Sequence, residues 1–360
     1  MPRPIRALID LSALRRNLAT LRAHARSARG WAVVKADAYG HGLERSARAL
    51  AAADGFALLE VAEAERLRSF GIGKPILLLE GCFDADDLAR AAALDLWTTV
   101  HSPEQIETIE RAAPARSLVV FLKMNSGMNR LGFSPADYVA AHARLAASGK
   151  VARIVLTTHF ADADGARGVA EQLARFEAAS AALPGERSIA NSAAALAFPE
   201  THRDWIRPGI MLYGCSPFAQ RSADSLGLVP AMTLESRIIG VQHLAAGDRV
   251  GYGGSFVAAH TMRIGVVACG YADGYPRHAP SGTPILVHGQ RSTTLGRVSM
   301  DMLVVNLSTI PEAGVGSEVE LWGRGLSADE VATSAGTVSY ELLCAVAPRV
   351  PRIEVADGQG

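Results

Sequence analysis

The first two-thirds of this chain alternate short apolar runs with amphipathic stretches, and this alternation constrains the fold more than any other feature. Each run is four to eight residues long, as buried β-strands are, and each intervening stretch is long enough for a helix. A strand followed by a helix and another strand favours parallel pairing. The eight runs are 31–36, 56–60, 75–80, 96–100, 118–124, 154–159, 188–191 and 206–213.

The stretches between the runs carry helix signals. Leu14, Leu18 and Leu21 repeat at helical spacing after Ser12, the expected N-cap. Eight parallel strands alternating with helices over about 200 residues predict a (β/α)8 TIM-type barrel. A doubly wound open sheet is the alternative, because a local pattern cannot show that a sheet closes. Further start and stop signals are Ser102-Pro103, Ser134-Pro135, Gly71 and Gly149.

The remaining third has a different pattern. Long helical repeats give way to short β-branched runs that are separated by glycine-rich turns, and only 327–334 reads as a helix, capped by Ser327. We therefore expect a barrel over 12–228 and a mostly β domain over 229–360, joined by an N-terminal strand within 1–11. The β-branched runs are 237–243, 263–268, 283–287, 302–307 and 319–321.

Charge and composition exclude several classes of partner. Basic and acidic residues both number 36, so no net charge favours nucleic acid or an anionic membrane. No segment approaches the roughly 20 apolar residues of a membrane span, and the N-terminal residues have no signal-peptide core. The four cysteines are far apart and form no Cys-x-x-Cys pair. We expect a cytoplasmic protein with reduced thiols, no metal site, no nucleic-acid partner and no membrane partner.

Polar side chains lie at the ends of several apolar runs of the predicted barrel, and Arg207 lies in the segment that includes the last run. In a barrel the carboxyl ends of all strands open on one face, which carries the active site. Each residue has a structural explanation by itself, such as a strand-end lysine that reaches water. Five clusters on one rim are hard to explain as core filling. The clusters are Lys35, Lys123, His159, Asn191-Ser192 and Arg207.

Two of these features together suggest a cofactor. Lysine forms Schiff bases with aldehydes. Ser192 follows the seventh run and the pair Gly209-Ile210 lies in the segment that includes the eighth, a region where barrels commonly bind phosphate with hydroxyl and backbone N–H groups. An aldehyde and a phosphate in one site indicate pyridoxal 5′-phosphate (PLP).

Six separated motifs match one family in order over nearly the whole chain. The chain resembles the alanine racemases, PLP enzymes built from a barrel and a β domain. The motifs are Val-Val-Lys-Ala-Asp-Ala-Tyr-Gly-His-Gly (33–42), Ser-Gly-Met-Asn-Arg-Leu-Gly-Phe (126–133), Arg-Pro-Gly-Ile-Met-Leu-Tyr-Gly (207–214), Val-Gly-Tyr-Gly (250–253), Gly-Tyr-Ala-Asp-Gly (270–274) and Gly-Arg-Val-Ser-Met-Asp-Met (296–302).

The resemblance implies two bases, Lys35 and Tyr252, on opposite faces of the substrate. Their reference pKa values are about 10.4 and 10, and nearby cations such as Arg130 and Arg207 would lower them. Racemisation removes a proton from Cα on one face and returns it on the other, which two bases do better than one that must swing.

The resemblance also implies the other roles. Arg207 would meet the pyridine nitrogen, and His159 would brace the cofactor ring. Arg130 would bind the substrate carboxylate and pair with a carbamylated Lys123. The remaining cofactor-binding residues would be Tyr39, Asn191, Ser192, Gly209, Ile210 and Tyr340, and the remaining substrate-binding residues would be Met300, Tyr271 and Asp301.

In this family the two bases come from different subunits of a homodimer, so the resemblance implies shared sites that convert L-alanine and D-alanine. A broad-specificity racemase, a decarboxylase of the same fold and a PLP carrier protein are the alternatives. Arg207 disfavours the decarboxylase, which places an acid there, and the second domain disfavours the carrier. Supply of D-alanine for peptidoglycan and its breakdown both remain open.

Overall fold

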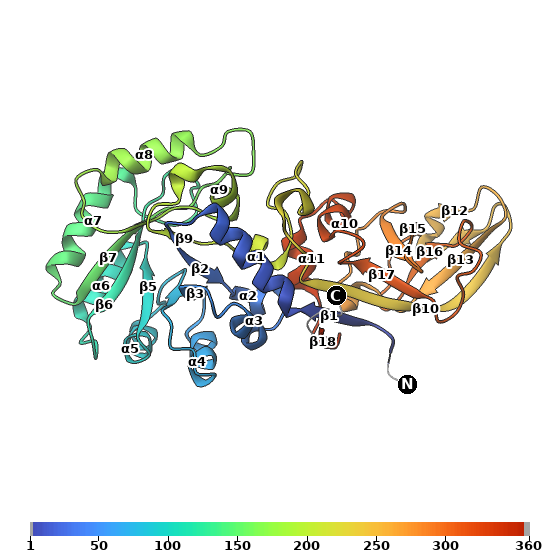
Figure 1. The fold of residues 1–360 in the computed structure, drawn as a ribbon, viewed down its shortest axis with the longest axis horizontal. Coiled ribbons are helices and arrows are strands. Elements are labelled where there is room, and N and C mark those ends of the chain that lie inside the picture. Colours follow the sequence, from blue (N-terminus) through green and yellow to red (C-terminus); the bar gives the residue numbers. More distant parts are fainter. Residues whose placement is uncertain (1–2, 356–360) are drawn as a thin grey trace.

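The computed structural model describes residues 3–355, which form a closed barrel beside a second, mostly β domain (Figure 1). Eight parallel strands close the ring in chain order, so the predicted (β/α)8 barrel is confirmed and the open sheet is wrong. The strands are β2 (Arg29–Val33), β3 (Gly55–Leu58), β4 (Ile76–Leu78), β5 (Leu96–Val100), β6 (Leu118–Lys123), β7 (Val151–Thr157), β8 (Arg187–Ser188) and β9 (Trp205–Ile206).

Helices connect the barrel strands and cover the outside of the ring (Figure 1). The first helix, α1 (Leu11–His24), is capped by Asp10 and not by Ser12 as predicted. The Asp10 carboxylate accepts from Ala13 N at 3.0 Å and from the Ser12 hydroxyl at 2.6 Å, so it satisfies a free N–H group of the first turn. The other α-helices of this domain are the short α2 (Lys35–Tyr39), α3 (Leu43–Ala49), α4 (Val61–Ser69), α5 (Ala85–Ala93), α6 (Pro103–Arg111), α7 (Pro135–Ala147), α8 (Ala170–Ser180) and α9 (Ser192–Ala197).

Aromatic side chains fill the inside of the barrel. Trp31 is fully buried and stacks on Trp205 at 4.6 Å between ring centroids, with Trp97 and Phe121 against its edges. A side chain at position 55 would meet the Trp31 ring at 2.3 Å, so glycine is required there. This packing fills the interior on the amino-terminal side and leaves the carboxyl ends of the strands to form a site.

The second domain is built on an eight-stranded sheet in the order β13-β16-β15-β14-β17-β10-β1-β18. Because β10 also pairs with β13, six of these strands form a ring. The predicted mostly β domain is confirmed. Its strands are β1 (Arg6–Asp10), β10 (Met232–Leu244), β13 (Met262–Val267), β14 (Pro284–Val287), β15 (Gln290–Leu295), β16 (Leu303–Asn306), β17 (Glu318–Trp322) and β18 (Arg352–Val355), with β11 (Arg249–Val250) and β12 (Phe256–Val257) as a separate pair.

The sheet unites strands from both ends of the described chain. Strand β1 pairs antiparallel with β10 and parallel with β18. This pairing supports the division that we propose, with a barrel over 12–228 and a second domain that combines 229–360 with 1–11.

Two helices of the second domain, α10 (Ala328–Ala335) and α11 (Ser339–Ala345), lie between the sheet and the barrel (Figure 1). Ser327 caps α10, as expected, by accepting from Asp329 N at 3.1 Å. Helix α11 packs so closely on the barrel that a Cβ at Gly40 would lie 2.2 Å from Leu343 O. The second domain therefore contributes directly to the carboxyl-terminal rim of the barrel.

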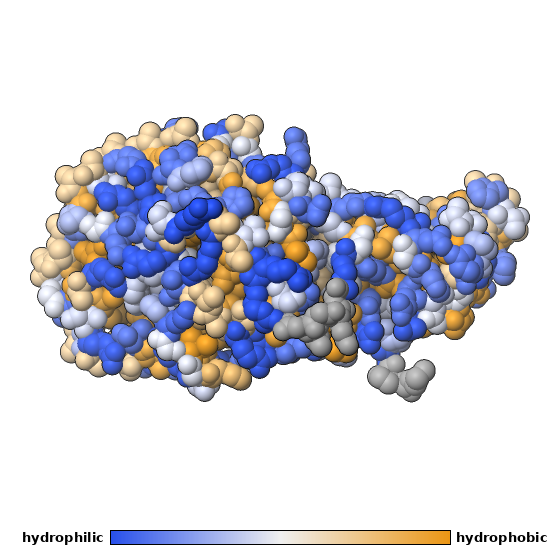
Figure 2. Space-filling model, viewed as in Figure 1, coloured by the Kyte–Doolittle hydropathy of each residue, from blue (hydrophilic) through white to orange (hydrophobic). Residues whose placement is uncertain are grey.

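The surface in Figure 2 mixes hydrophilic and hydrophobic residues over both domains. Within residues 3–355, no helix combines the length and the apolar character needed to cross a membrane.

Candidate active site

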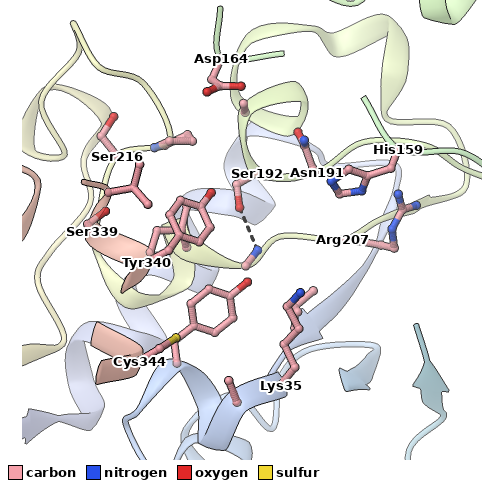
Figure 3. Close-up of a pocket in the computed structure, with 18 of the residues that line it drawn as sticks. Lys35, His159, Asp164, Asn191, Ser192, Arg207, Ser216, Ser339, Tyr340 and Cys344 are labelled. Carbon is pink, nitrogen blue, oxygen red and sulfur yellow. Dashed lines mark hydrogen bonds between the residues drawn. The ribbon is translucent and has the colours of Figure 1, made fainter. Parts of the chain in front are cut away.

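A cavity of about 1520 Å³ opens where the carboxyl ends of the barrel strands meet α10 and α11. Eleven of the fifteen residues singled out in the sequence line it, and Figure 3 shows several of them facing the same space. The eleven are Lys35, Tyr39, Lys123, Arg130, His159, Asn191, Ser192, Arg207, Gly209, Ile210 and Tyr340.

Lys35 begins an unusual turn rather than ending a strand. Strand β2 stops at Val33, and residues 36–39 then have φ between 52° and 54°, in the left-handed region. Such a conformation costs roughly 1–2 kcal/mol for each residue other than glycine. It persists because the turn is held by its surroundings: the Asp37 carboxylate accepts from Leu43 N at 2.8 Å, and Gly40 N donates to Ala36 O at 3.0 Å. The turn, denoted α2 (Lys35–Tyr39), brings Lys35 and Tyr39 to the same cavity.

A buried aromatic stack supports this turn from behind. Tyr39 lies on Tyr213 at 4.6 Å between ring centroids, and the Tyr213 hydroxyl donates to Val33 O at 2.8 Å. His41 also packs against Tyr213, with 4.7 Å between the ring centroids. Burial lowers the pKa of His41 to about 4, so the ring is neutral, and its Nδ1–H donates to Tyr39 O at 2.9 Å. The stack fixes the direction of the Tyr39 hydroxyl.

Ser192, Gly209 and Tyr39 meet at one point of the cavity. Asn191 caps α9 by accepting from Ala194 N at 3.0 Å, and this places Ser192 at the first position of the helix. Gly209 N donates to the Ser192 hydroxyl at 2.8 Å (Figure 3). A Cβ at Gly209 would lie only 2.3 Å from the Tyr39 hydroxyl oxygen. The three residues therefore surround a small space, the cradle, which is lined by N–H and O–H groups and which a side chain at position 209 would fill.

Tyr340 reaches the cavity from α11, on the second domain. Its ring lies 6.0 Å from that of Tyr39. Burial raises the pKa of both phenols, and the proximity of each phenol to ionisable neighbours raises it further. Both hydroxyls therefore remain protonated near neutral pH and can donate hydrogen bonds to an anion.

Arg207 is a buried, fixed cation. Only 8% of it is exposed, and it donates to the Ser188 hydroxyl at 2.8 Å and to Thr158 O at 2.6 Å. Burial lowers its pKa to about 10, which leaves the guanidinium charged near neutral pH. Burial, followed by the positive charges of Arg207 and its neighbours, holds the pKa of His159 well below its ordinary value, so its imidazole is neutral.

Lys123 ends β6 beside these cations, and its pKa is lowered to about 8. Burial is the largest cause, and the charges of Arg207 and Arg130 add to it. Part of this amine is therefore uncharged and nucleophilic near neutral pH. Arg130 is exposed at the mouth of the cavity.

The remaining four predicted residues do not line this cavity. Tyr252 lies in the short turn η4 (Tyr252–Gly254) and is 73% exposed, and Met300 is 53% exposed. The segments that carry these four residues nevertheless contact one another on the second domain. The Tyr271 segment meets the Met300 segment, because Tyr271 N donates to Ser299 O at 3.0 Å. The Tyr252 segment approaches the same stretch, since a Cβ at Gly251 would lie 3.7 Å from Arg297 O. The four are Tyr252, Tyr271, Met300 and Asp301.

The sequence interpretation missed several lining residues. Glu80 and His101 follow β4 and β5 at the same rim, and their position after an apolar run could have revealed them. Ser339 and Cys344 come from α11, and no local pattern indicated that this helix would reach the barrel.

Comparison with known proteins gives consistent matches over nearly the whole chain. The family models "Alanine racemase, N-terminal domain" and "Alanine racemase, C-terminal domain" match residues 9–217 and 231–354. The chain is 58% identical to an alanine racemase of Polaromonas naphthalenivorans, over 98% of this chain and 99% of that one. It is likewise 58% identical to one of Nitrosospira multiformis, over 98% and 100%.

Solved structures agree. The crystal structure of biosynthetic alanine racemase from Pseudomonas aeruginosa matches with a TM-score of 0.96 and 49% identity, over 98% of this chain and 100% of that one. Alanine racemase from Acinetobacter baumannii matches with a TM-score of 0.93 and 37% identity over the same shares.

Proposed function

Since the chain belongs to the alanine racemase family and interconverts L-alanine and D-alanine with PLP as its cofactor, we propose that the residues at the barrel rim hold PLP and that Lys35 and Tyr252 are the two bases. The observation that carries this assignment is the meeting of a lysine amine with the cradle of Ser192, Gly209 and Tyr39 in one cavity.

The donors present suit PLP. The two hydroxyls and the Gly209 N–H are suited to a phosphate, and the absent side chain at position 209 leaves space for it. Lys35 supplies the amine that binds the aldehyde of PLP. Arg207 is held by neutral acceptors and would donate to the ring nitrogen without surrendering its proton. Ile210, Asn191, His159 and Tyr340 complete the proposed cofactor site.

When bound, PLP withdraws electrons from Cα of alanine and so acidifies the Cα proton. Lys35 takes or returns that proton on one face, and Tyr252 does so on the other. Arg130 fixes the substrate carboxylate, with Met300, Tyr271 and Asp301 at the opening of the site, so that Cα stays between the two bases.

We further propose that Lys123 is carbamylated. Its depressed pKa favours attack by the neutral amine on CO2, which forms an N–C bond and releases one proton. The product is an anion, which would pair with Arg130 and replace the repulsion between two cations.

The second base requires a second subunit. Tyr252, Tyr271 and Met300 are exposed on one part of the second domain, and in the single chain they lie outside the cavity that contains Lys35. We propose a homodimer in which Tyr252 of one subunit enters the site of the other, so that each dimer has two shared sites. We also propose that the enzyme acts in the cytoplasm.

The test is subunit mixing. D-Alanine formation from L-alanine is measured for Lys35→Ala, for Tyr252→Ala and for hybrid dimers of the two. Each variant alone should be inactive, and each hybrid dimer should contain one intact site. Inactive hybrids of confirmed composition would overturn the shared site, and a protein that binds no PLP would overturn the cofactor assignment.

A further inference from the structure

The turn that carries Tyr271 has a buried carboxylate behind it. Asp273 ends the short helix η5 (Tyr271–Asp273), and its side chain is 0% exposed. One of its oxygens accepts from Gly270 N at 2.8 Å. The other accepts from Arg3 Nη1 at 2.5 Å and from Arg349 Nε at 2.8 Å. Asp273 therefore fixes both the turn and two arginines.

The same two arginines reach Asp301. Arg349 Nη2 donates to the Asp301 carboxylate at 2.7 Å, and Arg3 donates to the Asp301 backbone carbonyl. Arg349 thus bridges two carboxylates, one buried and one at the surface. Its planar group with several donors suits such a bridge, which a lysine could not reproduce.

Backbone contacts join the two segments into one unit. Tyr271 N donates to Ser299 O at 3.0 Å, and Ala272 N donates to Met300 O at 2.9 Å. The backbones approach so closely that a Cβ at Gly270 would lie 2.3 Å from Ser299 O. Movement of the Asp273 turn would therefore move Met300 and Asp301 with it.

We propose that Asp273, with Arg349 and Arg3, is a positioning residue that holds Tyr271, Met300 and Asp301 in the arrangement with which they enter the active site of the other subunit. This inference rests on the proposed shared site. Asp273 itself is buried and acts through its neighbours, so its effect should appear in the site that receives these residues and not in the cavity of its own subunit.

Asp273→Asn removes the charge that the two arginines share while keeping the shape of the side chain. A displacement of about 1 Å in such positioned groups can reduce a rate about 100-fold. We expect kcat to fall roughly 10- to 100-fold, with the PLP absorbance band, PLP affinity and dimer mass unchanged. Arg349→Gln, which changes a 43% exposed side chain, should have a similar effect. The control is Arg237→Gln, since Arg237 pairs with Glu318 at 3.0 Å with 44% exposure and should leave kcat unchanged.

Subunit mixing then tests whether Asp273→Asn impairs the site of its own subunit or the site of the other subunit. A hybrid of Asp273→Asn with Lys35→Ala contains one site that combines the intact Lys35 of the first chain with the intact second domain of the other. Its activity should equal that of the hybrid of Lys35→Ala with Tyr252→Ala. A hybrid of Asp273→Asn with Tyr252→Ala contains no complete site and should show no gain.

The outcomes separate the two proposals. If the hybrid of Lys35→Ala with Tyr252→Ala is inactive, the shared site is wrong. If that hybrid is active but neither Asp273→Asn nor Arg349→Gln is rescued by Lys35→Ala, the positioning role is overturned. Wild-type kcat in both variants would overturn it as well, and the Arg349→Gln arm decides the matter if Asp273→Asn does not fold.

Discussion

The cradle formed by Gly209 and Tyr39 allows a sharp test of the proposed phosphate site. In Gly209→Ala the new Cβ would lie 2.3 Å from the Tyr39 hydroxyl oxygen, whereas ordinary contact begins at 3.4 Å. Tyr39 must retreat by the difference of 1.1 Å, yet it is only 5% exposed and stacks on Tyr213. The hydroxyl should therefore leave the position from which it would donate to phosphate.

Loss of a hydrogen bond to a charged group costs about 1.5–3 kcal/mol. The Kd of PLP for the apo-protein should then rise roughly 10- to 150-fold. The assay is a PLP titration of the apo-protein followed by absorbance. Gly73→Ala is the control, because a Cβ there has nothing within 4 Å, and it should bind PLP as the wild type does.

A double-mutant cycle identifies the cause. In a Tyr39→Phe background the clashing oxygen is gone, and the nearest ring atom would be Cζ at 3.1 Å. Gly209→Ala should then add less than about 1 kcal/mol to the loss of PLP binding. Any other effect of the added methyl group is common to both backgrounds and cancels in the coupling energy. Additive losses, or wild-type affinity in Gly209→Ala, would refute the reasoning.

Three further predictions concern single side chains. With a pKa of about 8, the neutral share of Lys123 grows from about a tenth at pH 7 to about half at pH 8; native mass spectrometry should detect one carbamate per chain that Lys123→Ala lacks, and an unmodified chain would contradict carbamylation. As the pH falls, the unfolded chain binds a proton at His41 at a higher pH than the folded chain does. The free energy of unfolding should therefore fall by about 2–3 kcal/mol between pH 6.5 and pH 4, and urea denaturation of His41→Gln should show a decrease that is smaller by this amount. Trp31→Ala should cost about 3–5 kcal/mol of unfolding free energy and Trp31→Phe clearly less, since the buried indole N–H has no partner among the described residues; equal losses in urea midpoints would argue against this.

The strand pattern predicted the barrel well because each strand is defined by its own apolar run. Predictions were wrong where two nearby residues could serve the same purpose. Ser12 can cap a helix, but the carboxylate of Asp10 caps α1 instead. The run that contains Lys35 also looked like one strand to its end. The left-handed turn after Val33 was not predictable, because alanine and aspartate rarely adopt that conformation without tertiary support.

The sequence by itself determined the fold class and the family, and it indicated that Lys35, Lys123, His159, Ser192 and Arg207 gather at one rim, because β/α alternation places every strand end on one face. Tyr39, Arg130 and Tyr340 were implied only by the resemblance to the family. Only the tertiary structure revealed that α11 closes the cavity and that Asp273 ties Tyr271 to Asp301 through two arginines. These features depend on contacts between residues far apart in the chain. Local periodicity carries no information about such contacts, since they arise when separately folded elements pack together.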